Sequence, residues 1–158
     1  MSRIFKILTD HNPVLRKKSK KLSAEEIKSK EIKKFCADMV KTMAGKDGVG
    51  LAAPQVGKNI RLCVVNTKNG EIYLINPKII KKSWAKEWGE EGCLSFPGLF
   101  GEVRRHKKII CKFLDREGKE NIVQADGLLA RVIQHETDHL DGILFVDKAR
   151  NLKEVKSA

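Results

Sequence analysis

The chain has 158 residues, 41% of them hydrophobic and 33% charged, with a formal net charge of +12. This length predicts a single domain, residues 1–158, that is large enough to bury a core. The composition excludes a disordered or collagen-like chain, and no apolar run approaches the ~20 residues of a membrane helix. The first residues lack the apolar segment of a signal peptide. We therefore expect a cytoplasmic protein that makes no membrane contact.

The positive charge is spread along the chain in doublets. Such charge attracts polyanions by counterion release, which raises the hypothesis of contact with RNA or with the ribosome. Scattered doublets define no RNA-binding module, however, and aromatic residues make up only 6% of the chain, which leaves few stacking platforms. We favour lysines that serve solubility, with weak polyanion affinity. The doublets are Lys17-Lys18, Lys20-Lys21, Lys33-Lys34, Lys81-Lys82, Arg104-Arg105 and Lys107-Lys108.

The first third of the chain predicts a surface arm followed by a helix. After a short strand-like start, residues 10–21 contain a proline and many charges, and we expect them to be extended. Ser23 and Glu26 form the pattern of a capping box. Apolar side chains recur at helical spacing from Ile32 to Met43, and Gly45 marks the end of this helix.

The middle of the chain predicts strands. A glycine-rich stretch at 48–57 precedes strand-like runs at 60–65 and 72–76, with an Asn-Gly hairpin signal between them. Residues 84–88 continue as a strand or sheet edge, and runs at 108–113 and 121–123 flank a turn at Glu117-Gly118.

A second helix is expected from Ala125, with Asp126 as a possible cap. The predicted fold is α+β, with small antiparallel β-sheets packed around this central helix. The helix carries an H-E-x-x-H motif at His135, Glu136 and His139. Positions four apart lie on one helical face, so the two imidazoles can share a metal ion while the glutamate reaches a metal-bound water.

The motif needs a third ligand, and two downstream sources are poor. Metzincins have a third histidine six residues after the second, where this chain has Phe145. Glu154 lies in a short tail that we expect to be frayed. Upstream, Cys93 completes a Cys-His-His set suited to Zn²⁺ or Fe²⁺. A thiol-protease nucleophile is the alternative for Cys93, but it leaves Glu136 without a task. The other cysteines, Cys36, Cys63 and Cys111, are expected in the core.

Three stretches of the chain resemble, in order, the three signature motifs of peptide deformylases. They are Gly48-Val49-Gly50-Leu51-Ala52-Ala53-Pro54-Gln55, Glu91-Gly92-Cys93-Leu94-Ser95 and Gln134-His135-Glu136-Thr137-Asp138-His139-Leu140. The resemblance runs from about Asp10 to Asp147. It implies an α+β fold with the metal helix in the middle, and removal of the formyl group from the N-terminal formyl-methionine of nascent polypeptides.

The resemblance also implies a task for each site residue. Cys93, His135 and His139 would bind the metal, natively Fe²⁺ in many members, with Zn²⁺ or Ni²⁺ able to occupy the site. Glu136 would deprotonate the metal-bound water and later protonate the leaving amine. The Gln55 side-chain amide and the Leu94 backbone N–H would hold the developing oxyanion.

Further positions follow from the same resemblance or from their place beside the motifs. The backbone near Gly50 would lie beside an extended peptide substrate. Val49, Leu128 and Val132 are candidates for the pocket that takes the methionine side chain. Arg105 resembles the family arginine that follows the cysteine motif, and we expect it to pair with Glu91.

The chain departs from the family pattern in four places. The arm keeps Leu15-Arg16 but lacks the usual Pro-Asp before it. Phe100 stands where some members have an arginine near the substrate, and Arg131 stands where many are apolar, which would make the pocket rim more polar. The tail after Asp147 is short, which weakens any inference of a long C-terminal helix that docks on the ribosome.

Two other hypotheses remain. One is a catalytically silent, basic ribosome- or RNA-binding protein with a structural metal. It is disfavoured because Glu136 and Gln55 are intact and a structural site would close its fourth position with a protein ligand. The other is a metallopeptidase that cleaves ordinary amide bonds, which shares the chemistry but not the cysteine-containing ligand set.

Overall fold

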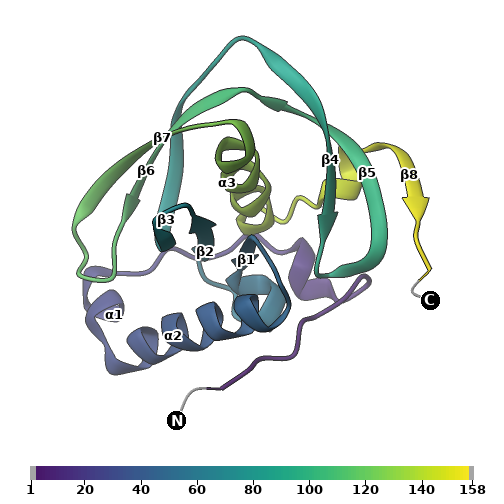
Figure 1. The fold of residues 1–158 in the computed structure, drawn as a ribbon. Helices are drawn as coiled ribbons and strands as arrows, with labels where there is room; N and C mark the ends of the chain where they lie inside the picture. The colour runs from purple at the N-terminus through teal and green to yellow at the C-terminus, as the bar shows by residue number, and fades with distance from the viewer. Residues whose placement is uncertain (1–2, 157–158) are drawn as a thin grey trace.

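The computed structural model describes residues 3–156, in which two antiparallel β-sheets enclose helix α3 (Gly127–Leu140) (Figure 1). This arrangement confirms the predicted α+β fold around a central helix. The sheet with strand order β1-β2-β3-β6-β7 consists of Gly50–Ala52, Leu62–Thr67, Gly70–Lys82, Lys108–Leu114 and Glu120–Asp126. The sheet with order β4-β5-β8 consists of Lys86–Cys93, Phe96–His106 and Arg150–Glu154.

Two consecutive helices precede the first sheet, where the sequence predicted one. Helix α1 (Ala24–Lys28) has the expected capping box, because Ser23 Oγ accepts from the Glu26 amide while the Glu26 carboxylate accepts from the Ser23 amide. Ser29 has extended φ and ψ angles and ends α1, and its hydroxyl then caps α2 (Lys30–Gly45). The predicted apolar face of α2 is buried in the core.

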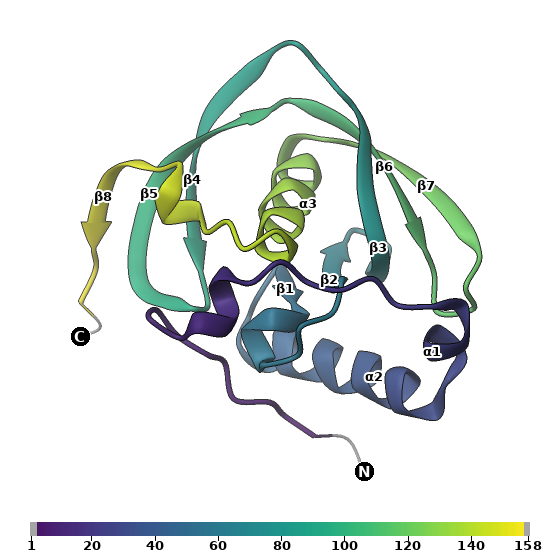
Figure 2. The ribbon, with the colours of Figure 1, turned by 180° about the vertical axis from the view of Figure 1, so that it is seen from behind.

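The two sheets are joined where strands cross from one to the other, at the top of the molecule in Figures 1 and 2. Strand β3 leads through residues 83–85 into β4, and β5 leads through the single residue Lys107 into β6. The two crossings hold each other, because the Lys107 amide donates to the Ala85 carbonyl at 3.0 Å and the Ser83 amide donates to the Lys108 carbonyl at 2.9 Å. We call residues 81–86 together with residues 107–108 the apex.

Several boundaries differ from the sequence predictions. The β2–β3 turn consists of Lys68 and Asn69, and Gly70 (φ +104°) already pairs with Thr67. Helix α3 starts two residues later than expected because Ala125 belongs to β7, and the Asp126 side chain makes no capping hydrogen bond.

The two chain ends also differ from expectation. The start of the described chain is not a strand, and the arm contains the 3₁₀ helix η1 (Pro13–Arg16), which buries Leu15. The tail expected to be frayed forms β8, in which Glu154 pairs with Leu99 of β5.

The core confirms the expected burial of the three other cysteines, since Cys36, Cys63 and Cys111 are each 0% exposed. None of the helices within residues 3–156 has the length and apolar character needed to span a bilayer.

Gly142 provides a test of the turn that follows α3. It has φ +74°, and a Cβ atom there would collide with the Arg16 carbonyl oxygen. We therefore expect Gly142→Ala to lower the free energy of unfolding by roughly 2–4 kcal/mol, through backbone strain and the clash. Gly45→Ala is the control, because nothing lies within 4 Å of that position at the end of α2, and alanine there should be neutral or stabilising by up to about 1 kcal/mol. Urea denaturation measures both, and equal stabilities would contradict the prediction.

Candidate functional site

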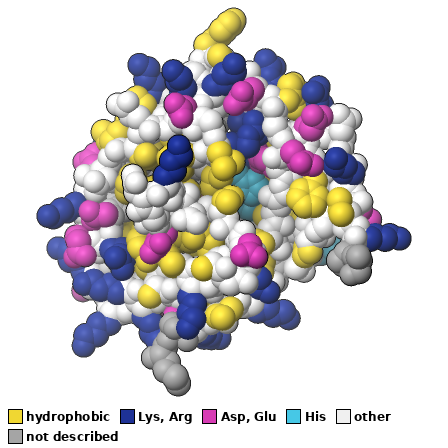
Figure 3. Space-filling model, viewed as in Figure 1, with side chains coloured by type: hydrophobic (Ala, Val, Ile, Leu, Met, Phe, Trp, Pro, Cys, Tyr) yellow, Lys and Arg dark blue, Asp and Glu magenta, His cyan; other side chains and the backbone are white. Residues whose placement is uncertain are grey.

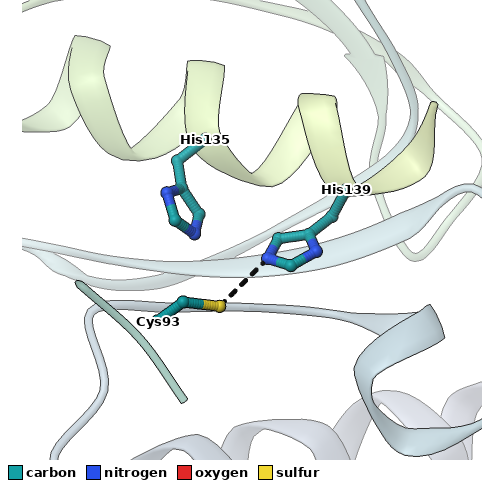
Figure 4. A group of neighbouring side chains, drawn as sticks. All are labelled: Cys93, His135 and His139. Carbon is teal, nitrogen blue, oxygen red and sulfur yellow. Dashed lines mark hydrogen bonds between the residues drawn. The ribbon is translucent and has the colours of Figure 1, made fainter. Parts of the chain in front are cut away.

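Three potential metal ligands converge between α3 and the end of β4 (Figure 4). His135 and His139 project from one face of the helix, as their spacing predicts, and Cys93 is the last residue of β4. Cys93 Sγ lies 3.3 Å from His139 Nε2, and one ligand atom from each residue lies within 4.8 Å of the others. A thiol and two imidazoles at these separations fit one shared ion with an open fourth position.

A buried carboxylate orients one of these ligands. Glu91 Oε1 lies 2.8 Å from His135 Nδ1, which leaves Nε2 of that ring to face the cluster. The expected Arg105–Glu91 pair is present and bidentate, with both distances 2.9 Å. Arg105 also donates to Asp138 at 2.6 Å, and Lys148 lies 2.9 Å from the same carboxylate. Burial opposes the charge on Glu91, but the bonds from Arg105 and His135 hold its pKa below the usual value.

Arg131 provides a second guanidinium that is hydrogen-bonded to Glu91. This contact was not predicted from the sequence. Arg131 Nη1 donates to Glu91 Oε2 at 2.7 Å and to the Val103 carbonyl at 2.9 Å, and its Nη2 donates to the Glu87 carbonyl at 3.0 Å. The side chain is only 11% exposed. Arg131 therefore ties α3 to β4 and β5, and it also lines the neighbouring cavity, where its charge is paired with Glu91. The signal in the sequence was the position of Arg131 four residues before His135, which places both side chains on one face of the helix.

Glu136 is a buried carboxylate that lacks a full set of partners. It is 4% exposed, and its Oε1 has no hydrogen-bond partner within the described part of the chain. Its Oε2 packs so closely on Gly50 that a Cβ there would lie 2.6 Å away. Burial, with a smaller contribution from the Glu91 charge, raises the pKa of Glu136 to about 7. A carboxyl with this pKa can exchange a proton near neutral pH.

The two histidines differ in charge preference. Burial opposes protonation of His135, but the neighbouring Cys93 and Glu91 outweigh it and raise its pKa to about 10. Burial and the nearby charge of His135 lower the pKa of His139 well below its usual value. His139 is thus a neutral imidazole, as a metal ligand must be, and a bound cation would displace the proton from His135.

Gln55 presents its amide nitrogen to the ligand cluster. It lies in the 3₁₀ helix η2 (Ala53–Val56), and its Oε1 accepts from the Ala52 amide at 2.9 Å. This bond fixes the amide so that Nε2 donates to Ser95 Oγ at 3.1 Å and lies 3.4 Å from Cys93 Sγ. Ser95 is 0% exposed, and sequence reasoning gave it no task because its partner is 40 residues away.

The N-terminal arm connects the segments that carry Gln55 and Ser95. The Leu8 amide donates to the Gln55 carbonyl at 2.7 Å, and the Asp10 amide donates to the Ser95 carbonyl at 3.0 Å. Leu8 and Asp10 therefore hold the segments of Gln55 and Ser95 to one short stretch of backbone.

A cavity of about 760 Å³ opens beside the ligands, and the predicted substrate residues Val49, Gly50, Leu128 and Val132 all line it. Leu94 also lines it. Val132 is 7% exposed, whereas Leu128 is 68% exposed and Val49 51%. Val132 is therefore deep in the cavity, and Leu128 and Val49 lie at its mouth. In Figure 3 a histidine is visible in a hollow bordered by hydrophobic side chains.

Comparison of the sequence with known proteins gives a consistent result. The family described as Polypeptide deformylase matches residues 4–155. A peptide deformylase of Symbiobacterium thermophilum is 48% identical over 156 residues, which cover 96% of this chain and 70% of that protein. A peptide deformylase of Natranaerobius thermophilus is 45% identical over 150 residues, which cover 94% of each.

Solved structures agree with the sequence matches. The peptide deformylase of Thermotoga maritima superposes with a TM-score of 0.90 at 40% identity, covering 94% of this chain and 99% of that one. An Acinetobacter baumannii peptide deformylase, described as bound to Met-Ala-Ser, has a TM-score of 0.89 at 33% identity, covering 94% and 99%. The chain thus belongs to the peptide deformylase family, the metal-dependent hydrolases that remove the formyl group from the N-terminal formyl-methionine of nascent polypeptides.

Proposed function

We propose that Cys93, His135 and His139 bind the catalytic metal ion, and that Glu136, Gln55 and Leu94 carry out deformylation. The observation that carries this assignment is the incompletely paired, buried carboxylate of Glu136, beside three convergent ligand atoms at a cavity wall. We infer that residues 1–158 act as one catalytic domain, because the metal ligands come from β4 of one sheet and from α3, which the two sheets enclose.

We infer that Fe²⁺ is the native ion and that Zn²⁺ or Ni²⁺ can replace it. A mixed set of one thiolate and two imidazoles supports all three assignments, because first-row divalent metals accept both ligand types. A bound ion supplies a Lewis acid that polarises the formyl oxygen and lowers the pKa of water.

The protein groups account for the proton transfers. Glu136, as carboxylate, takes a proton from the water that adds to the formyl carbon, and it then delivers this proton to the leaving nitrogen as the C–N bond breaks. The products are formate and a free amino terminus. Gln55 Nε2 and the Leu94 backbone N–H donate to the formyl oxygen as negative charge develops on it.

The cavity accounts for the choice of substrate. We propose that Val132 lines the deep part of the pocket that takes the methionine side chain, that Val49 and Leu128 line its mouth, and that the backbone near Gly50 lies beside the peptide. The Met-Ala-Ser complex of the Acinetobacter baumannii relative supports a peptide of this kind as ligand. Since the substrate is a nascent chain, we also infer a cytoplasmic location and contact of the basic surface with the ribosome.

Formate release from a formyl-Met-Ala-Ser peptide tests the assignment of Glu136. Glu136→Gln preserves the shape of the side chain but removes the proton acceptor, so we expect turnover to fall by about 10²–10⁴-fold, the usual contribution of a general base. The bound metal, measured by elemental analysis after anaerobic purification, should remain. Glu120→Gln, an exposed carboxylate paired with Lys112, is the control. Formate release by Glu136→Gln at the wild-type rate would refute the assignment.

The pH dependence follows from the raised pKa of Glu136. Only the carboxylate can accept a proton, so kcat/KM should rise with pH and reach a plateau above the pKa. A bound cation favours the carboxylate, which puts the inflection at or below about 7. The measurement is formate release between about pH 5 and 9 at constant ionic strength. A flat profile across the acidic half of this range would contradict the prediction.

Gln55→Ala removes a positioned donor from the formyl oxygen. We expect kcat to fall by about 10²–10³-fold, as for other oxyanion donors, with little change in metal content. Gln124→Ala, at an exposed position of β7, is the matched control and should keep full turnover. Retained turnover in Gln55→Ala would remove this residue from the mechanism.

Val132→Trp fills the deep part of the cavity. We expect KM for formyl-Met-Ala-Ser to rise about tenfold or more, because one misfitted side chain costs 1–3 kcal/mol of binding. Formyl-Gly-Ala-Ser, which has no side chain at that position, is the control substrate and should be less affected. Thermal unfolding of the variant checks that the fold is intact. An unchanged KM for the methionine peptide would exclude Val132 from the pocket.

A further inference from the structure

Trp84 is 99% exposed at the apex. Tryptophan has one of the largest apolar areas of any side chain, and here the whole ring is open to a ligand. In Figure 3 a hydrophobic side chain projects from the top of the molecule, above a group of Lys and Arg side chains. The other tryptophan, Trp88, contrasts with it, because the Arg150 guanidinium lies 3.5 Å from its ring centroid.

The backbone that presents Trp84 is held on both sides. The Ser83 amide donates to the Lys108 carbonyl at 2.9 Å, and the Lys107 amide donates to the Ala85 carbonyl at 3.0 Å. The Ser83 hydroxyl donates to the Ala85 carbonyl at 2.8 Å, which closes the turn around Trp84. The ring is therefore displayed by a fixed turn between the two sheets, and little further ordering of the backbone is needed for a ligand to use it.

Five lysines belong to the apex that carries this ring, and all of them are exposed. Two doublets that are scattered in the sequence meet here because β3 and β6 are paired, and a fifth lysine opens β4. Among residues 3–156, ion pairs engage other lysines but none of these five. Carboxylates are few near the apex. Asp126 is paired with Lys108 across the sheet, and Glu87 follows Lys86 in the chain. The lysines are Lys81, Lys82, Lys86, Lys107 and Lys108.

We propose that the apex binds single-stranded RNA, with a base stacked on Trp84 and backbone phosphates paired with the five lysines. An exposed aromatic face inside a group of unpaired cations is the combination that single-stranded nucleic acid recognises. The flanking residues Ser83 and Ala85 add little apolar surface to that of Trp84, which disfavours a lipid bilayer as the partner. The surface is separate from the active site, since no apex residue lines the cavity as described over residues 3–156. The proposal deepens the ribosome contact inferred above by assigning a surface and a chemistry to it.

Tryptophan fluorescence tests the stacking directly. The chain has two tryptophans, so Trp88→Phe leaves Trp84 as the sole reporter in the metal-loaded protein. We expect an oligouridylate of about ten nucleotides to quench this emission at low salt. The logarithm of the binding constant should fall with the logarithm of salt concentration by about 0.7 for each phosphate neutralised.

Matched variants distinguish RNA binding at the apex from RNA binding that depends only on the net charge of the protein. In fluorescence anisotropy with labelled oligouridylate, Trp84→Ala should weaken binding about tenfold or more, the usual loss of one stacking residue. Lys81→Gln/Lys82→Gln should weaken binding and reduce the salt slope by about 1.4. Lys17→Gln/Lys18→Gln removes the same charge from an exposed doublet of the arm and should have a smaller effect.

Three results would overturn the proposal. They are failure of the oligonucleotide to quench Trp84 at low salt, equal losses of affinity in the two lysine double variants, and quenching by phosphatidylglycerol vesicles but not by RNA. Formate release from free formyl-Met-Ala-Ser is measured in parallel and should be unchanged in Trp84→Ala. A failure of RNA binding is thereby distinguished from a failure of the proposed catalytic function.

Discussion

The buried carboxylate of Glu91 is the interaction on which the active site depends. It joins β4, which carries Cys93, to α3, which carries both histidines, and it accepts from Arg105 and Arg131 as well as from His135. A carboxylate with two guanidinium partners and one imidazole partner is satisfied in the interior, whereas loss of a guanidinium would leave uncompensated buried charge and cost about 3–5 kcal/mol. The same bonds select the ring orientation of a metal ligand, so that fold stability and site geometry rest on one group.

The two sheets and the crossings between them bring β4 and α3 together. Strand β4 belongs to a different sheet from β1, yet residues of both border the active-site cavity. The crossings at the apex make this possible, since they carry the chain over α3 and back. The helix is covered on its apolar face, and Glu136 is buried away from water. Its raised pKa is therefore a consequence of how the sheets enclose the helix.

Features encoded over short distances could be predicted from the sequence. The Ser23 capping box, the apolar face of α2 and the shared face of His135 and His139 depend on residues within one or two turns. Features that depend on distant partners could not. The C-terminal strand exists because β5 offers an edge some fifty residues upstream, and the contact of Gln55 with Ser95 joins segments 40 residues apart. Helical spacing and ligand chemistry indicated His135, Glu136, His139 and Cys93, whereas the task of Gln55 came only from the resemblance to a family.

The N-terminal arm has a consequence for the motion of the site. The segments bearing Gln55 and Ser95 are not neighbours in either sheet, yet the Leu8 and Asp10 amides bridge their backbones. Loosening of the arm would remove these two backbone bonds and leave the side-chain bond from Gln55 to Ser95 as the link between the two segments. Hydrogen exchange at the Leu8 and Asp10 amides would report how often these two bonds open, and the free energy of that opening should be lower than the free energy of global unfolding. The arm thus contributes to the position of the Gln55 amide although it supplies none of the metal ligands or catalytic groups proposed for the site.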